Sequence, residues 1–203
     1  MEGIYFTQKK IENEGPETYA CSKFLGTPAI PQGLLHNKDG EFILTDADYF
    51  VMQLNLADIA DRETPLPKEG MLYFFVDVDD LKPKVIFAKD ISNCKLEVYD
   101  DINDGFDRES YGETDGYRLV FDKSLDDGHY VLGDVDPDLD LETDIDIDGY
   151  VTLLEIDYLA LPNDNMLNFG ELAPGDGHYI FLIKEDDLKK CRFSRVKLID
   201  KED

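Results

Sequence analysis

The sequence of 203 residues has no tryptophan and only three cysteines, Cys21, Cys94 and Cys191. Three isolated cysteines without a Cys-x-x-Cys pair match neither a disulfide framework nor a zinc site. We therefore expect reduced thiols and a cytoplasmic protein. The sequence also lacks a signal-peptide pattern and any apolar run long enough to cross a bilayer, so we expect no membrane association.

Basic residues are scarce as well. The chain has 20 Lys and Arg against 46 Asp and Glu, which gives a formal net charge of −26. A surface of this sign repels nucleic acid and anionic membranes, and it attracts cations and basic proteins. We therefore expect no nucleic-acid partner.

Familiar catalytic signatures are missing. The sequence contains no Gly-x-Ser-x-Gly, Walker A, His-Glu-x-x-His or Gly-x-Gly-x-x-Gly pattern, and His36, His129 and His178 occur singly. His129 and His178 each follow Asp-Gly and precede Tyr, which is typical of two equivalent strand starts. We predict no catalytic residues and no cofactor, and the sequence favours a protein that is not an enzyme.

Turn signals, by contrast, recur along the chain. Asp-Gly occurs six times, each time with an aromatic residue close behind. Asp-Gly favours tight hairpin turns, and aromatic residues favour the strand that follows. Only two stretches, 55–61 and 185–190, have the pattern of short helices. We predict an α+β fold that is β-rich, mainly antiparallel sheet with short helices.

Two parts of the sequence resemble each other. GMLYFFVDVDDLK (70–82) aligns without a gap to GHYIFLIKEDDLK (177–189), and upstream VMQLN (51–55) matches LLEID (153–157). Two matches in the same order indicate an internal pseudo-duplication. We expect its halves around 48–90 and 149–199, within a single domain that spans 1–203.

Several segments are similar to a known family. They are SKFLGTPAIPQG (22–33), FVMQLNLADI (50–59), LPKEGMLYFFVD (66–77), HYVLGDVDPD (129–138), LLEID (153–157) and the stretch 169–196. Together they resemble the YwqG-like family of bacterial proteins, a domain of unknown function. The resemblance implies a compact β-rich domain with a pseudo-repeat and no established catalytic residues. Some relatives stand beside toxin genes, which suggests an immunity role. The family's tryptophans are absent here, and His36 and Phe169 stand near their places.

One stretch matches a metal-binding motif. DIDIDGYVTLLE (144–155) has the residue pattern of an EF-hand calcium loop. However, the motif also requires flanking helices, whereas Pro137 and the alternating pattern upstream disfavour one and YVTLLEID downstream is typical of a strand. We therefore interpret Glu155 as a strand residue. Asp144, Asp146 and Asp148 remain a candidate calcium site of another kind.

The motif belongs to a longer acidic ladder in which every second residue from 134 to 148 is acidic. This period of two is the alternation of a half-buried strand with one charged face. Asp is a poor strand former, however, and we expect a solvated loop. Neighbouring carboxylates on that face would repel by about 0.6 kcal/mol per pair in water, so cations, a basic partner or the chain's own Lys and Arg should relieve the repulsion. The candidate partner-binding residues are Asp134, Asp136, Asp138, Asp140 and Glu142.

Three functions follow from these observations. The leading hypothesis is a non-enzymatic protein-interaction module whose acidic face binds a basic partner, as an immunity protein would. The first alternative is a divalent-cation binder that uses the ladder, with calcium as its ligand. The second is a carboxylate-dependent hydrolase, since paired carboxylates perform general acid–base chemistry, but 46 acidic residues single out no particular pair.

Overall fold

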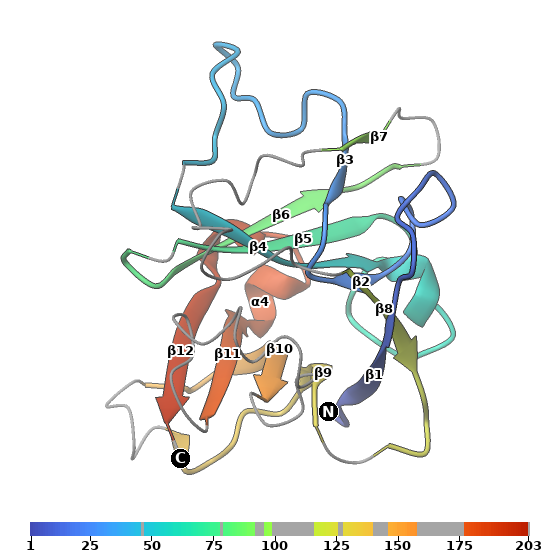
Figure 1. Cartoon of the computed structure of the whole chain (residues 1–203). Helices are drawn as coiled ribbons and strands as arrows, with labels where there is room; N and C mark the ends of the chain where they lie inside the picture. Colours follow the sequence, from blue (N-terminus) through green and yellow to red (C-terminus); the bar gives the residue numbers. More distant parts are fainter. Residues whose placement is uncertain are drawn as a thin grey trace. The chain divides into compact units, whose positions relative to one another are not determined.

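The computed structural model describes residues 1–45, 47–77, 79–91, 96–98, 116–125, 128–139, 146–157 and 177–202 (Figure 1). The chain forms two compact units. Unit 1 comprises Met1–Thr7, Thr64–Leu66 and Val120–Asp203, and unit 2 comprises Gln8–Glu63 and Pro67–Leu119.

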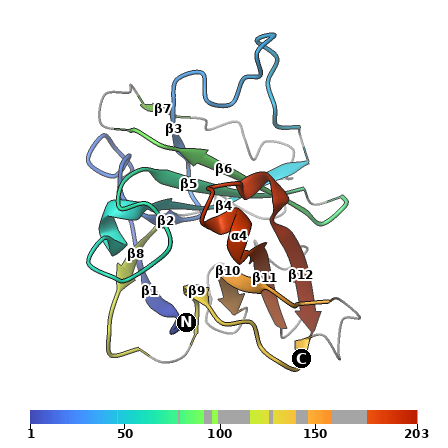
Figure 2. The same cartoon turned by 180° about the vertical axis from the view of Figure 1, so that it is seen from behind.

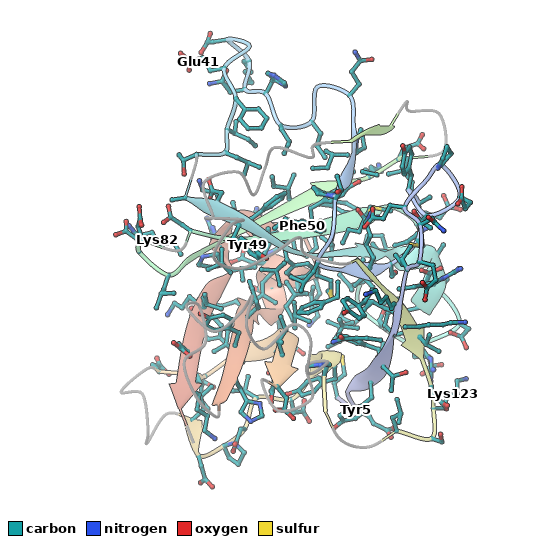
Figure 3. All side chains as sticks on the ribbon, viewed as in Figure 1. Tyr5, Glu41, Tyr49, Phe50, Lys82 and Lys123 are labelled. Carbon is teal, nitrogen blue, oxygen red and sulfur yellow. The ribbon has the colours of Figure 1, made fainter. Side chains whose placement is uncertain are left out.

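Unit 2 is built on antiparallel strands. Their order is β8 (Tyr117–Phe121), β2 (Lys23–Phe24), β4 (Asp48–Asn55), β5 (Met71–Asp77) and β6 (Lys82–Ala88), and the last two residues of β8 belong to unit 1. A separate pair joins β3 (Ala29–Pro31) to β7 (Leu96–Val98). The aromatic and aliphatic side chains of β4 and β5 are almost all buried, which explains their nearly continuous apolar sequences. Between β3 and β4 the chain makes an excursion with Glu41 at its outer end (Figure 3).

Unit 1 is also antiparallel. Its strand order is β12 (Lys197–Glu202), β11 (Gly177–Lys184), β10 (Tyr150–Asp157), β9 (Tyr130–Gly133) and β1 (Ile4–Lys10), the last of which continues into unit 2. The chain between β11 and β12 forms the short helix α4 (Glu185–Leu188) and the 3₁₀ turn η2 (Phe193–Arg195). Figure 2 shows this connection from behind.

The predicted α+β class is wrong, because the described residues form mostly antiparallel β-sheet. The predicted helix at 55–61 is the 3₁₀ turn η1 (Leu56–Ile59), whose first turn the Asn55 side chain caps by accepting from the Ala57 N–H at 3.0 Å. The predicted helix at 185–190 is the four-residue α4. One helical turn fixes several dihedral angles for one hydrogen bond, so such short segments do not extend without a buried face. No helix in the described ranges has the length and apolarity to cross a membrane.

The hairpins β4–β5 and β10–β11 share a register. Each contains a bulge at the equivalent place, between Phe50 and Met52 in one and between Thr152 and Leu154 in the other. At the second pair after the bulge, Gln53 pairs with Tyr73 and Glu155 pairs with Ile180. These positions are the ones that the sequence alignment of 51–55 with 153–157 and of 70–82 with 177–189 brings together.

The strands next to these hairpins, β2 beside β4 and β9 beside β10, also correspond to each other. Leu25 and Leu132 both have a φ of 54°, which is unusual for a residue other than glycine, and each precedes a glycine. The Leu119 N–H donates to the Ser22 carbonyl at 3.0 Å, just as the Phe6 N–H donates to the His129 carbonyl at 3.1 Å. Residues 22–26 therefore have the local geometry of residues 129–133. That the chain is a single domain with duplicated halves stays a prediction.

Candidate functional site

The described part of the acidic ladder covers apolar residues of unit 1. We call residues 134–139 and 146–149 the acidic strap. Leu139 is fully buried in a cluster with Ile180, Leu182 and Ile199. Val135, Ile147 and Tyr150 pack against the same cluster. The apolar residues that alternate with the acids thus anchor the strap to the sheet.

The carboxylates of the strap point the other way. Asp134, Asp136, Asp138, Asp146 and Asp148 are all exposed. The charged face predicted from the period of two is therefore present among the described residues.

The described residues of the strap form turns and irregular backbone, and not the half-buried strand that the alternation alone would suggest. The Asp138 N–H donates to Asp136 Oδ1 at 3.0 Å, and the Asp148 N–H donates to Asp146 Oδ1 at 3.1 Å. The Leu139 N–H donates to the Asp136 carbonyl at 3.1 Å. Asp side chains compete for nearby backbone N–H groups in this way, and the result is a turn instead of a strand.

Cations of unit 1 partly relieve the repulsion in the strap. The Met1 amino group forms an ion pair with Asp134. The Lys201 Nζ lies 3.6 Å from Asp136 Oδ2. Asp138, Asp146 and Asp148 have no ion pair with a described residue. Asp140, Glu142 and Asp144, also predicted as site residues, lie outside the described residues.

The candidate calcium residues are not tested by this geometry. Asp146 and Asp148 share one Asx turn, and Asp144 is not described. Within the described ranges, no group of three or more His, Cys, Asp and Glu side chains has the arrangement of a metal site. Glu155 lies in β10, as its interpretation as a strand residue predicts.

Glu155 instead belongs to a polar cluster across β9, β10 and β11. Tyr130 Oη donates to Glu155 Oε2 at 2.5 Å, and His178 Nδ1 lies 3.0 Å from Glu155 Oε1. Tyr5, labelled in Figure 3, packs its ring 5.3 Å from the Tyr130 ring. Burial raises the pKa of Tyr130 far above its ordinary value, and the negative charge of Glu155 and the hydrogen bond to it add to the rise. Tyr130 is thus a neutral donor that holds the Glu155 carboxylate.

His129 lies beside this cluster. Its Nδ1 accepts from the Asp157 N–H at 3.1 Å, and its ring stacks on Phe6 at 5.5 Å. The sequence-based interpretation of His129 and His178 as single strand-start residues did not foresee that His178 pairs with Glu155. The available signal was that charged Glu155 stands between the apolar residues Leu154 and Ile156 of the strand.

Unit 2 contains a second polar feature, which sequence reasoning missed. The side chain of Lys23 is completely buried, and its Nζ donates to Glu14 Oε2 at 2.6 Å. The other oxygen of the same carboxylate, Oε1, accepts from the Thr27 N–H at 3.2 Å. A Cβ added at either Gly26 or Gly116 would overlap with Oε1. We call Lys23, Gly26, Thr27 and Gly116 the Lys23 notch.

Hydrogen bonds hold the backbone around the Lys23 notch in place. Ser22 Oγ donates to Asp58 Oδ2 at 2.7 Å and accepts from the Asn55 N–H at 2.9 Å. Gln53 Nε2 donates to the carbonyls of Tyr19 and Cys21 at 2.9 and 2.8 Å. Cys21 is buried and free, and burial is the main cause that raises the pKa of its thiol. This thiol is therefore poorly suited to act as a nucleophile.

Comparison with known families gives one match. A family model described as a domain of unknown function (DUF1963) matches residues 22–130, which is more than half of the 203 residues. The matched range contains all four residues of the Lys23 notch, but neither Glu14 nor the acidic strap. No curated protein matches the chain. An unknown-function family agrees with the resemblance noted in the sequence, whereas the name YwqG-like stays a prediction.

Proposed function

The chain belongs to the family described as a domain of unknown function (DUF1963), and from that premise we propose that it is a protein-interaction module whose acidic strap binds a basic protein. The observation that carries this proposal is the orientation of the strap. Its apolar residues are anchored in the cluster around Leu139, while five carboxylates face solvent.

Anchoring favours binding because fewer residues of the strap lose conformational freedom when a partner binds. A freely moving acidic loop loses conformational freedom in any complex. A strap held by Val135, Leu139 and Ile147 presents its charges already in place. The net charge of −26 adds a long-range attraction that steers a basic partner towards the protein.

A more specific version of this proposal is that the protein is an immunity protein, which binds and neutralises a toxin. A toxin with a basic surface would supply the Lys and Arg side chains that Asp138, Asp146 and Asp148 lack among the described residues. Support for this form comes from the family resemblance and from charge complementarity.

A capture experiment tests the proposal with a matched pair of variants. The strap variant carries Asp138→Asn, Asp146→Asn and Asp148→Asn, because Asn keeps the Oδ1 acceptor that the Asx turn needs. The control variant carries Glu12→Gln, Glu63→Gln and Glu69→Gln, three exposed acids of unit 2. Both variants lose the same charge.

Wild type and control, immobilised at low salt, should retain a basic protein from an extract of the source cells and release it as salt rises. The strap variant should retain much less of it. Equal retention by both variants would show that bulk charge, and not the strap, attracts the partner. Retention of nothing by wild type would contradict the proposal.

Calcium binding by Asp144, Asp146 and Asp148 is the alternative. Calorimetric titration with calcium in physiological salt distinguishes a calcium site from a surface that binds a basic protein. A discrete calcium site gives a saturable binding heat, which Asp146→Asn removes. Diffuse attraction of calcium to the strap gives only a weak heat, which added salt removes. The carboxylate-dependent hydrolase stays a prediction, and it would need turnover that disappears when either of two convergent acids is mutated.

A further inference from the structure

We propose that the Lys23 notch of unit 2 is a binding site for a carboxylate ligand, and that Glu14 occupies it as an internal ligand. This inference is independent of the acidic strap, since it concerns a buried cation in the other unit. The ligand class is a carboxylate group, carried either by a small organic acid or by an acidic residue of a peptide.

The first argument is the buried charge. Lys23 is completely buried, and its ammonium points to one carboxylate oxygen of Glu14 at 2.6 Å. A buried ammonium is costly unless an anion accompanies it. Lys23 therefore creates a requirement for a negative group at this point, whichever molecule supplies that group.

The second argument is the donor geometry. The two oxygens of the carboxylate have different donors, since Lys23 Nζ binds Oε2 and the Thr27 N–H binds Oε1 at 3.2 Å. A charged donor and a backbone donor on opposite oxygens recognise a carboxylate as a group, and not merely as a point charge. Both donors belong to one short stretch of chain, residues 23–27, which begins with β2.

The third argument is the space. A Cβ at Gly116 would overlap with Glu14 Oε1, and a Cβ at Gly26 would overlap with that oxygen and also meet Gly116 Cα at 2.6 Å. The two glycines thus leave a gap that fits a carboxylate and would not fit one if either residue had a side chain.

Unit 1 offers a comparison at the corresponding positions. There Tyr130 stands in place of Lys23, and its ring lies against Gly133 and Gly3, where an added Cβ would come within 2.5 and 3.0 Å of ring atoms. In unit 1 the chain's own aromatic ring takes up the gap beside the glycines. In unit 2 the gap accommodates a charged group instead.

The fourth argument is the exposure of the occupant. The side chain of Glu14 keeps 25% of its surface exposed, although Lys23 beneath it is completely buried. The occupant therefore faces solvent on one side, where a ligand could replace it.

The backbone beside Glu14 has hydrogen bonds of its own. The Ile11 N–H donates to the Gly116 carbonyl, and the Thr18 N–H donates to the Gly15 carbonyl in a turn within the loop, both at 2.8 Å. Neither bond involves the Glu14 side chain, so that side chain can leave the notch without breaking them. The side chains next to it in this loop are exposed, namely Glu12, Asn13, Pro16 and Glu17.

The test empties the notch and offers it another carboxylate. Glu14→Ala removes the internal ligand, and Glu17→Ala, an exposed acid three residues away, is the control. Sodium acetate should raise the melting temperature of Glu14→Ala above the value in sodium chloride of equal ionic strength. Neutral acetamide should not. Wild type and Glu17→Ala should each have the same melting temperature in sodium acetate as in sodium chloride.

Two further measurements complete the test. Lys23→Met combined with Glu14→Ala should abolish the acetate effect, because the ammonium is gone. The peptide IENEGPET (11–18) should bind Glu14→Ala about tenfold or more tightly than wild type, where the internal ligand competes. A peptide with glutamine at the position that corresponds to Glu14 should lose that binding. Acetate rescue without peptide binding identifies a small-acid site, and strong peptide binding identifies an acidic-peptide site.

The proposal would be overturned if Glu14→Ala had the same melting temperature in acetate and in chloride and did not bind the peptide. The contact between Glu14 and Lys23 would then be an ion pair with a structural role alone. Glu14→Gln covers the case in which Glu14→Ala does not fold, because glutamine keeps an oxygen for the Thr27 N–H and removes only the charge. The peptide should then bind the Glu14→Gln protein more tightly than wild type, since the neutral amide competes less well for the ammonium. Equal affinity for the two proteins would contradict the proposal.

Discussion

Lys23 and Tyr130 occupy the same register position in the two units. Lys23 pairs with Gln53 of β4, and Tyr130 pairs with Glu155 of β10. In each case the side chain reaches a carboxylate, that of Glu14 for the ammonium and that of Glu155 for the phenol. One backbone arrangement thus supports two different polar sites, each of which can be perturbed separately.

The close fit of Glu14 against Gly116 predicts a coupled pair of mutations. Gly116→Ala would place its Cβ in the space that Glu14 Oε1 takes up, so the Glu14 side chain must move away and leave the buried Lys23 ammonium without its partner. We therefore expect a loss of about 1–3 kcal/mol in the free energy of unfolding. In a Glu14→Ala background the same change should cost much less, because the obstructing oxygen is absent. Urea denaturation of the four proteins in this cycle measures the coupling. Additive losses would show that Glu14 does not fill the gap.

The environment of Tyr130 predicts an alkaline loss of stability. Its pKa in the folded protein is raised, chiefly by burial, whereas an unfolded tyrosine ionises at about pH 10. Above that pH the unfolded chain has lost the proton and the folded chain keeps it, so stability falls as pH rises. Below about pH 10 this contribution is fully present.

Tyr130→Phe removes the titrating group and should make the decline in unfolding free energy above about pH 10 shallower. Denaturation at a series of alkaline pH values measures the slope. Tyr19→Phe, in unit 2 and outside the cluster, is the control and should keep the wild-type slope. The same slope in Tyr130→Phe and wild type would contradict the burial of this phenol.

The anchoring of the strap predicts a stability cost at Leu139. Leu139 is completely buried against Ile180, Leu182 and Ile199, so Leu139→Ala should cost about 2–4 kcal/mol. Val120, also in unit 1, is 44% exposed, and Val120→Ala should change stability by no more than about 0.5 kcal/mol. Thermal and urea unfolding compare the two variants. A small effect of Leu139→Ala would mean that the strap is not anchored.

The sequence predicted some of these features because they depend on local patterns. Alternation in the strap correctly predicted that Val135, Leu139 and Ile147 face the sheet, although Pro137, at an equivalent place, is exposed. It could not predict the turn at Asp136, because the choice between strand and turn depends on whether a neighbouring strand is available for pairing. The lengths of the two predicted helices were wrong for a similar reason. The polar starts at Asn55 and Glu185 were visible, but the length of a helix depends on the surface that it packs against.

The Lys23 notch was beyond sequence reasoning for another reason. Lys23 and Glu14 are separated by a loop, and Gly116 is distant from both in the chain, so no spacing brings the three together. A lysine is normally exposed. Lys23 is buried in a strand that lies between β4 and β8, and the sequence does not predict that position. The side-chain contact between Glu155 and His178 is equally non-local, because it requires β10 and β11 to be in register.

The most direct test of the proposed interaction is a titration with a defined basic probe, a peptide of alternating lysine and serine, at several salt concentrations. Wild type and the control variant Glu12→Gln/Glu63→Gln/Glu69→Gln should bind it with similar affinity. The strap variant Asp138→Asn/Asp146→Asn/Asp148→Asn should bind about tenfold or more weakly, with a shallower salt dependence because fewer close charge pairs form. Equal affinities and equal salt slopes for the two variants, which carry the same net charge, would contradict the acidic strap as the binding surface.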